Sequence, residues 1–180
     1  MAKKKFWTSE KIVAFSAMFI SVLTLYIFIR QTNLIETQNH LSTMPYLLFD
    51  ASQNGEENIF SIDLVNYGVG PVIIENMRIF YKGESYEMGT VEFFQKNIPE
   101  MERDSINVMN YSSIRQGIAI PANGRRNIVT IGGSEKNYRD FLKIFSKIQG
   151  EGFNYQIKYK SIYNDHWQIE SKSNIPEKIE

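Results

Sequence analysis

The side chains that most often carry out catalysis or bind metals are sparse in this sequence. There are two histidines, His40 and His166, and no cysteine, so disulfides and thiolate metal sites are excluded. The histidines fall in different predicted elements, and no H-E-x-x-H, D-x-D or G-x-S-x-G pattern occurs. We interpret both as solvated surface residues and predict a non-enzymatic protein without metal or cofactor. A hydrolase whose site is assembled only by folding is the alternative.

The glycines of Gly68-Val69-Gly70-Pro71 are the other pattern with chemical meaning, because glycine-rich loops can cradle phosphates. The segment lacks the longer glycine spacing and the following helix that such loops need. We interpret it as a turn between two strands, where glycine supplies a positive φ and Pro71 begins the next strand. Acidic residues are scattered, and Asp63 is predicted on the solvated face of its strand.

One stretch organises the rest of the chain. Residues 12–29, IVAFSAMFISVLTLYIFI, contain no charge, proline or glycine, and a helix of this length is about 27 Å long, close to the hydrocarbon thickness of a bilayer. We predict one membrane-spanning helix over residues 12–30, with a cytoplasmic tail at residues 1–11. The predicted membrane-spanning residues include Ile12, Ile20, Ile27 and Ile29.

Two other interpretations of this stretch are weaker. A cleaved signal peptide would have a shorter apolar core followed by small residues, whereas Phe28-Ile29-Arg30 follows here. A buried core helix should show a polar face, but Ser16, Ser21 and Thr24 are the only clearly polar residues in the run.

Charge predicts the orientation. Four lysines precede the run, and only Arg30 follows it closely; basic flanks stay in the cytoplasm. We therefore expect a single-pass protein of the cell inner membrane with residues 31–180 outside, in the periplasm of a Gram-negative cell. The residues after Arg30 comprise 15 basic and 19 acidic groups, a net charge of −4. This balance argues against direct contact with nucleic acid.

Apolar residues continue beyond the run in steps of seven. Ile20, Ile27, Leu34 and Leu41 form such a stripe. Because Gln31 and Gln38 lie between them, the pattern makes a poor coiled coil. We interpret residues 31–43 as a helical stalk that holds the domain above the bilayer. Self-association along the stripe is the alternative.

Residues 44–172 predict a β-rich globular domain. Phe60, Ile62 and Leu64 alternate with polar residues, which indicates a half-buried antiparallel strand. Further strand patterns occur at residues 46–49, 72–81, near 86, at 114–120 and at 127–131. A hairpin at residues 153–171 turns at Asn164-Asp165. A short helix is expected at residues 91–98, a loop at 100–112, and an amphipathic helix begins after Ser134.

These elements favour an α+β fold that is mainly β. We expect a transmembrane helix followed by an antiparallel β-sandwich of immunoglobulin-like size with one added amphipathic helix. An open sheet with the helix across one face is the alternative. Residues 173–180 are expected to be a frayed tail.

Two sequence segments resemble a loose group of small bacterial single-pass membrane proteins. These proteins combine an N-terminal anchor and a short polar helix with an R/M-P-Y-L-like segment and an L-x-N-x-G-x-G-P motif. Here the segments are residues 44–47, MPYL, and residues 64–71, LVNYGVGP, and the similarity covers residues 10–82. Such proteins also look like membrane effectors of bacterial anti-phage loci, including retrons, which are thought to kill an infected host by damaging its inner membrane.

The leading hypothesis is a membrane-anchored module whose partners are the lipid bilayer and either another protein or further copies of itself. It follows from the apolar run, the compact β domain and the lack of a catalytic cluster. The resemblance implies the second hypothesis, a membrane effector of phage defence. That role would require oligomers, because one span cannot make a pore.

Overall fold

The computed structural model describes residues 8–173 and 175–179. The chain divides into two compact units between Ser42 and Thr43. The first unit holds the helix α1, and the second, called the β domain below, holds all other elements.

The helix α1 runs without interruption from Ser9 to Ser42. It contains the predicted membrane-spanning residues and most of the predicted stalk, and it ends shortly before Pro45, which disfavours helical backbone at the preceding residue. The Ser21 and Thr24 hydroxyls each donate to a carbonyl oxygen four residues earlier, at 2.8 Å. No residue of α1 is buried. Of the described helices, α1 alone is long and apolar enough to cross a membrane.

The β domain contains two antiparallel sheets. The first has four strands in the order β1-β2-β7-β5, with β1 at Leu47–Asn54, β2 at Ile59–Asn66, β7 at Arg125–Ile131 and β5 at Val108–Tyr111. The second has six strands. Its path is β10-β9-β8-β3-β4, and β6 pairs with the start of β3. Its bounds are Val72–Tyr81 for β3, Glu84–Tyr86 for β4, Ala119–Ile120 for β6, Asn154–Lys160 for β8, His166–Glu170 for β9 and Glu177–Ile179 for β10.

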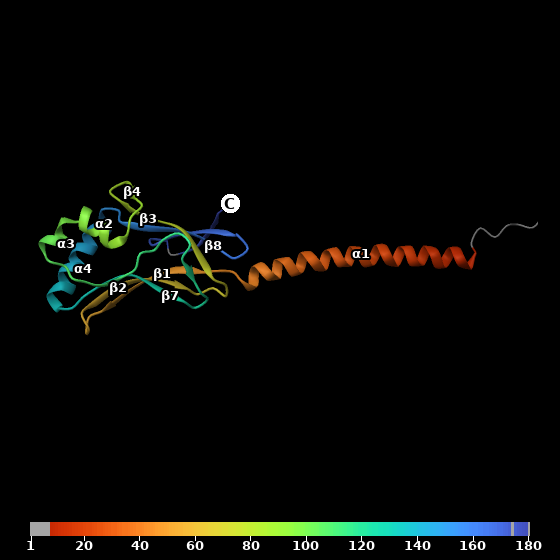
Figure 1. Cartoon of the computed structure of the whole chain (residues 1–180), viewed down its shortest axis with the longest axis horizontal. Helices are drawn as coiled ribbons and strands as arrows, with labels where there is room; N and C mark the ends of the chain where they lie inside the picture. The colour runs from red at the N-terminus through yellow and green to blue at the C-terminus, as the bar shows by residue number, and fades with distance from the viewer. Residues whose placement is uncertain (1–7, 174, 180) are drawn as a thin grey trace, which may run out of the picture. The chain divides into compact units, whose positions relative to one another are not determined.

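Both sheets contribute to one hydrophobic core. Figure 1 shows β1, β2 and β7 on one side of this core, with β3 and β8 on the other. Phe49 of β1 stacks on Tyr155 of β8 with ring centroids 5.7 Å apart. The alternating residues Phe60, Ile62 and Leu64 are all buried, as predicted. The fold is therefore α+β and mainly β, with a long apolar helix at its N-terminal end.

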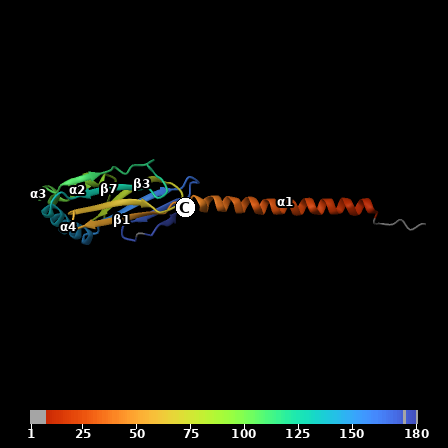
Figure 2. The same cartoon turned by 90° about the horizontal axis from the view of Figure 1, so that it is seen from below.

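Three helices belong to the β domain, where the sequence indicated one added helix and a short one before it. They are α2 at Thr90–Asn97, α3 at Pro99–Arg103 and α4 at Glu135–Gly150, and Figures 1 and 2 show them together at one end of the sheets. The α3 helix begins with Pro99, whose fixed φ suits a first helical position. This helix and β5 occupy much of the segment predicted as a loop.

The amphipathic helix α4 begins as predicted. The Ser134 side chain caps it by accepting a hydrogen bond from the Asn137 backbone N–H at 3.2 Å. Its apolar face packs on the first sheet, because the Phe60 ring lies 5.1 Å from that of Phe141 and 4.8 Å from that of Phe145. These contacts lie inside the core of the β domain.

Three further expectations about local structure were wrong. The hairpin of β8 and β9 has a loop of residues 161–165 and not a two-residue turn, because the Ser161 hydroxyl accepts hydrogen bonds from the backbone N–H groups of Tyr163 and Asp165. The expected strand at residues 114–120 is reduced to β6. Part of the expected frayed tail forms β10, which pairs with β9 and brings Lys178 within 2.7 Å of Asp165.

Candidate functional site

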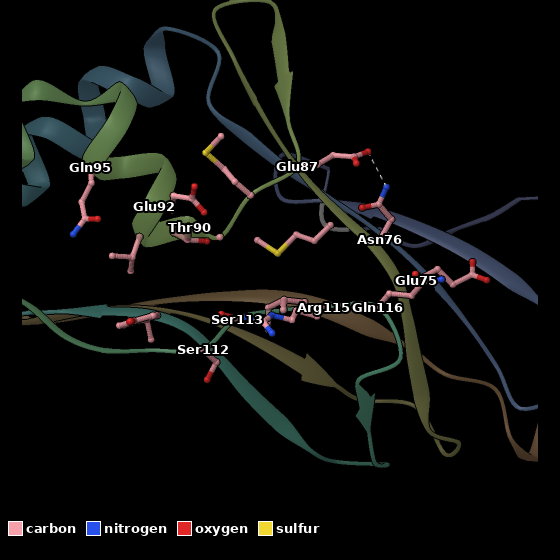
Figure 3. Close-up of a pocket in the computed structure, with 16 residues that line it drawn as sticks. Glu75, Asn76, Glu87, Thr90, Glu92, Gln95, Ser112, Ser113, Arg115 and Gln116 are labelled. Carbon is pink, nitrogen blue, oxygen red and sulfur yellow. Dashed lines mark hydrogen bonds between the residues drawn. The ribbon is translucent and has the colours of Figure 1, made fainter.

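A polar cleft of about 720 Å³ lies between the two sheets at one side of the β domain. One wall comes from β3, the segment after β4 and the start of α2, and the other from residues 111–116, which lead from β5 toward β6. Figure 3 shows these walls facing each other across open space. The polar residues lining the cleft are Glu75, Asn76, Glu87, Thr90, Glu92, Gln95, Ser112, Ser113, Arg115 and Gln116.

Glu87 has the most developed hydrogen bonding in the cleft. It accepts hydrogen bonds from Arg78 at 2.7 Å and from the Asn76 side-chain amide at 3.3 Å. The bond from Arg78 is the main cause of a lowered pKa for Glu87, and the Asn76 bond adds to it. Glu87 is therefore held as a carboxylate at neutral pH, and Figure 3 shows its bond to Asn76.

The other two carboxylates of the cleft also have basic partners. Glu75 lies 2.9 Å from the Nδ1 atom of His166, and Glu92 lies 2.7 Å from the Lys96 ammonium. The cleft contains hydroxyl groups, but no histidine, cysteine or lysine is among the residues that line it. The three carboxylates of the cleft are therefore each held by a neighbouring side chain.

The two histidines belong to different units of the chain. His40 belongs to α1, and His166 begins β9 with its side chain 29% exposed. His166 is thus half-buried and paired with Glu75, which differs from the simple solvated residue that the sequence indicated. Among residues 8–173 and 175–179, no three His, Cys, Asp or Glu side chains are grouped so that they could hold a metal ion.

Asn66 explains the L-x-N-x-G-x-G-P motif. Its side chain is fully buried and donates to the carbonyl oxygens of Gly70, Ile120 and Pro121 at 2.8, 3.2 and 3.0 Å. Its side-chain oxygen accepts from the backbone N–H groups of Gly68 and Tyr46. One amide therefore joins three chain segments, and the role of the motif is structural.

The two glycines of this motif are needed for a reason other than the predicted one. Neither Gly68 nor Gly70 is among the residues with positive φ. A Cβ atom at Gly70 would overlap the carbonyl oxygen of Thr43, and one at Gly68 would overlap the backbone nitrogen of Tyr46. Glycine is required because the backbone at the start of the β domain passes directly against this turn.

Asp63 is buried, whereas the sequence indicated a solvated position. The pairing of β2 with β7 shifts register between Ile62 and Asp63. Asp63 then receives hydrogen bonds from Arg125 at 2.8 Å and from the Asn127 amide at 2.7 Å. Arg125 also contacts Asp50 at 2.7 Å, and the hydrogen bond to Asp63 is the main cause of its raised pKa. Alternation within one strand could not reveal this charged cluster.

The predicted residues of the self-association stripe lie on one continuous helix. Steps of seven residues drift by only about 20° around a helix, so Ile20, Ile27, Leu34 and Leu41 form one stripe along α1. All four are exposed in the single chain, as are Ile12 and Ile29. The cleft residues were not singled out from the sequence, because their grouping depends on how the two sheets meet.

No family model, curated protein or solved structure matches the chain.

Proposed function

We propose that this chain is a single-pass membrane protein whose β domain acts through contacts with other proteins and not through catalysis. The observation that carries the proposal is the exposed apolar surface of α1. Residues 12–29 contain no charge, and none of α1 is buried in the structure. Such a surface needs an apolar surrounding, and its length matches the hydrocarbon thickness of a bilayer.

The lysine-rich N-terminal flank supports a cytoplasmic N-terminus, with residues 31–180 outside the inner membrane.

Because the chain contains no cysteine, single introduced cysteines can be labelled selectively to test this orientation. In intact spheroplasts, Ser52→Cys in the exposed part of β1 should react with a membrane-impermeant maleimide. Ser9→Cys, at the start of α1, is the matched control and should react only after lysis. Labelling in the reverse pattern would place the β domain in the cytoplasm. If the chain were absent from the membrane fraction, the proposal that α1 anchors it in a membrane would be wrong.

For the β domain we infer a β-sandwich of immunoglobulin-like size. The shared core and the contact between Phe49 and Tyr155 across the two sheets support this architecture. The polar cleft is the surface best suited to a protein partner, because its walls present amide, hydroxyl and carboxylate groups and its carboxylates are held by hydrogen bonds or ion pairs. No residue of this cleft requires a cofactor for that role.

A second candidate function, a membrane effector of phage defence that acts as an oligomer, is favoured by one observation. The stripe of Ile20, Ile27, Leu34 and Leu41 is exposed along the whole of α1, including the polar part beyond Arg30. If copies pack along it, replacing Leu34 and Leu41 together by serine should reduce crosslinked oligomers severalfold while leaving membrane insertion intact. Ile35→Ser is the matched control, because this exposed residue lies about 100° around the helix from Leu34.

Membrane depolarisation during overexpression or phage infection separates the two candidates. An effector should depolarise the membrane, and the double serine variant should do so less. If the unmodified protein stays monomeric in both resting and infected cells, the effector role is excluded and the anchored module remains.

A further inference from the structure

Exposed apolar side chains of the β domain gather at one end. Eight large apolar residues after Ser42 are exposed among the described residues, and five of them lie on loops or a strand start at this end. They form the surface that we call the loop-end patch: Tyr46, Tyr67, Val69, Ile162 and Tyr163, which are 38 to 65% exposed.

Backbone contacts bring these residues together. The N–H of Tyr67 donates to the carbonyl of Tyr46 at 2.8 Å, and the N–H of Val69 donates to that of Met44 at 3.1 Å. The register of β3 with β8 pairs Ile73 with Lys160, which places the loop of residues 161–165 beside the turn that precedes β3. Figure 1 shows these loops at the end of the sheets away from α2, α3 and α4.

The loops of the patch are held in place from inside. Asn66 holds the turn at residues 67–71 through two hydrogen bonds, to Gly68 and Gly70, and its other bonds tie this turn to the neighbouring segments. The Ser161 hydroxyl holds the 161–165 loop. Covering a surface that is already ordered loses little conformational entropy, which favours binding. A preformed group of three tyrosines and two aliphatic residues is typical of an interaction surface.

The length of α1 indicates whether a bilayer or a protein covers the loop-end patch. From Arg30 to Ser42 the helix rises about 18 Å. The polar interfacial layer of a bilayer is about 5–8 Å thick on each side, and membrane helices tilt by about 20° on average. With residues 12–29 filling the hydrocarbon, Ser42 lies beyond the headgroups. The patch lies close to this point of the chain, because its residue Val69 donates a backbone hydrogen bond to Met44, two residues after Ser42. A protein surface therefore suits the patch better than lipid.

The outer part of α1 carries the matching surface. Leu34 and Leu41 are 58% and 62% exposed. Two copies anchored in the same bilayer hold corresponding residues at the same height above the membrane. Ser42 at the end of α1 is bonded to Thr43, whose backbone adjoins the patch at Gly70, so the chain connection alone keeps the patch of a neighbouring copy near the height of Leu41.

We propose that the loop-end patch is an interface with a second copy of this chain, and that it receives Leu34 and Leu41 from the outer part of the neighbour's α1. The inference rests on the membrane anchoring proposed above and deepens it by naming the partner. Contact between two different surfaces of the chain is heterologous, so repeated contacts of this kind close into a ring or extend as a chain of copies.

The test uses the full chain in membranes. Two differently tagged versions, one with Leu41→Cys and one with Val69→Cys, are co-expressed and treated with a short bismaleimide, so that only links between copies join the two tags. We expect a crosslinked dimer carrying both tags. The control pairs Leu41→Cys with Glu56→Cys and should give at least tenfold less product. Glu56 lies in the exposed turn between β1 and β2, at the other end of these strands.

Three outcomes would overturn the inference. Links between two Leu34→Cys copies without any Leu41–Val69 link would show that copies associate but that the patch faces elsewhere. An environment-sensitive dye on Val69→Cys that is shielded in nanodiscs holding one copy each would assign the patch to lipid. A protein that forms no links at all is a monomer. In each case, labelling of Ser52→Cys in spheroplasts tests the proposed membrane anchoring and topology independently of the crosslinking result.

Discussion

The Asn66 side-chain amide donates a hydrogen bond to the carbonyl oxygen of Gly70 at 2.8 Å, inside the turn that joins β2 and β3. The same side chain binds the turn before β7 and the backbone at Tyr46. Asn66 is fully buried, and its bonds to Gly68, Gly70 and Ile120 are buried as well, so these backbone groups would be left without a partner if the side chain were removed. This one residue therefore links the segments at the end of the β domain that follows α1 in the chain.

Replacing Asn66 by alanine should therefore lower the free energy of unfolding by about 2–4 kcal/mol, since several buried backbone groups lose their partner. Chemical denaturation of the purified chain measures this change. Asn54→Ala is the matched control, because the Asn54 side chain also accepts two backbone hydrogen bonds but lies in an exposed turn. Its cost should stay under about 1 kcal/mol. Equal losses for the two variants would contradict a special role for Asn66.

Gly70→Ala should destabilise the β domain more than an ordinary surface substitution, by about 3 kcal/mol or more, because the new Cβ would overlap the Thr43 backbone. Gly55→Ala provides the control. A Cβ at Gly55 meets no atom within 4 Å, and this variant should change the melting temperature little. A tolerated Gly70→Ala would mean that the backbone at Thr43 can move away from the turn.

The buried carboxylate of Asp63 depends on Arg125. Arg125→Met removes one charge-assisted hydrogen bond from a side chain only 8% exposed, and should cost about 1–3 kcal/mol. The neighbouring Arg126 is exposed, and Arg126→Met should cost less than about 0.5 kcal/mol. Denaturant titrations of both variants compare the two losses directly. Similar values would show that solvent already satisfies Asp63.

Alkaline pH should destabilise the β domain through its buried tyrosines. Burial raises the pKa of Tyr159 to about 12 and also raises the pKa of Tyr155, whereas an unfolded tyrosine has a pKa of about 10. Because the folded pKa is the higher one, this contribution to stability is present below pH 10 and is lost as pH rises from about 10 to about 12.

Melting temperatures between pH 8 and 12 test this expectation. Tyr159→Phe also loses the hydrogen bond that the Leu47 N–H donates to the tyrosine hydroxyl, so its melting temperature at neutral pH should be somewhat lower. Its further fall above pH 10 should be smaller than that of the unmodified chain. Tyr111→Phe, at an exposed position, should leave the alkaline slope unchanged. A slope unaffected by both variants would assign the alkaline loss to other groups.

Several elements were predictable because their signal is local. The long helix follows from an uninterrupted apolar run, and α4 follows from a serine cap and apolar residues spaced three and four apart. The buried alternation of Phe60, Ile62 and Leu64 was also correctly predicted. In each case the residues that determine the element lie within a few positions of one another, so periodicity and capping suffice.

The candidate cleft and the charged cluster were decided by the tertiary structure. Asp63 and Arg125 are 62 positions apart, and Asn66 reaches a carbonyl 54 positions away. A register shift beside Asp63 turned a predicted solvated side chain into a buried one, and the approach of residue 43 gave Gly70 a steric role that its own turn does not show. The sequence by itself determined which segments are apolar and helical or extended. Only the folded chain decided which distant backbone and charged groups meet, because those contacts depend on strand pairing across the domain.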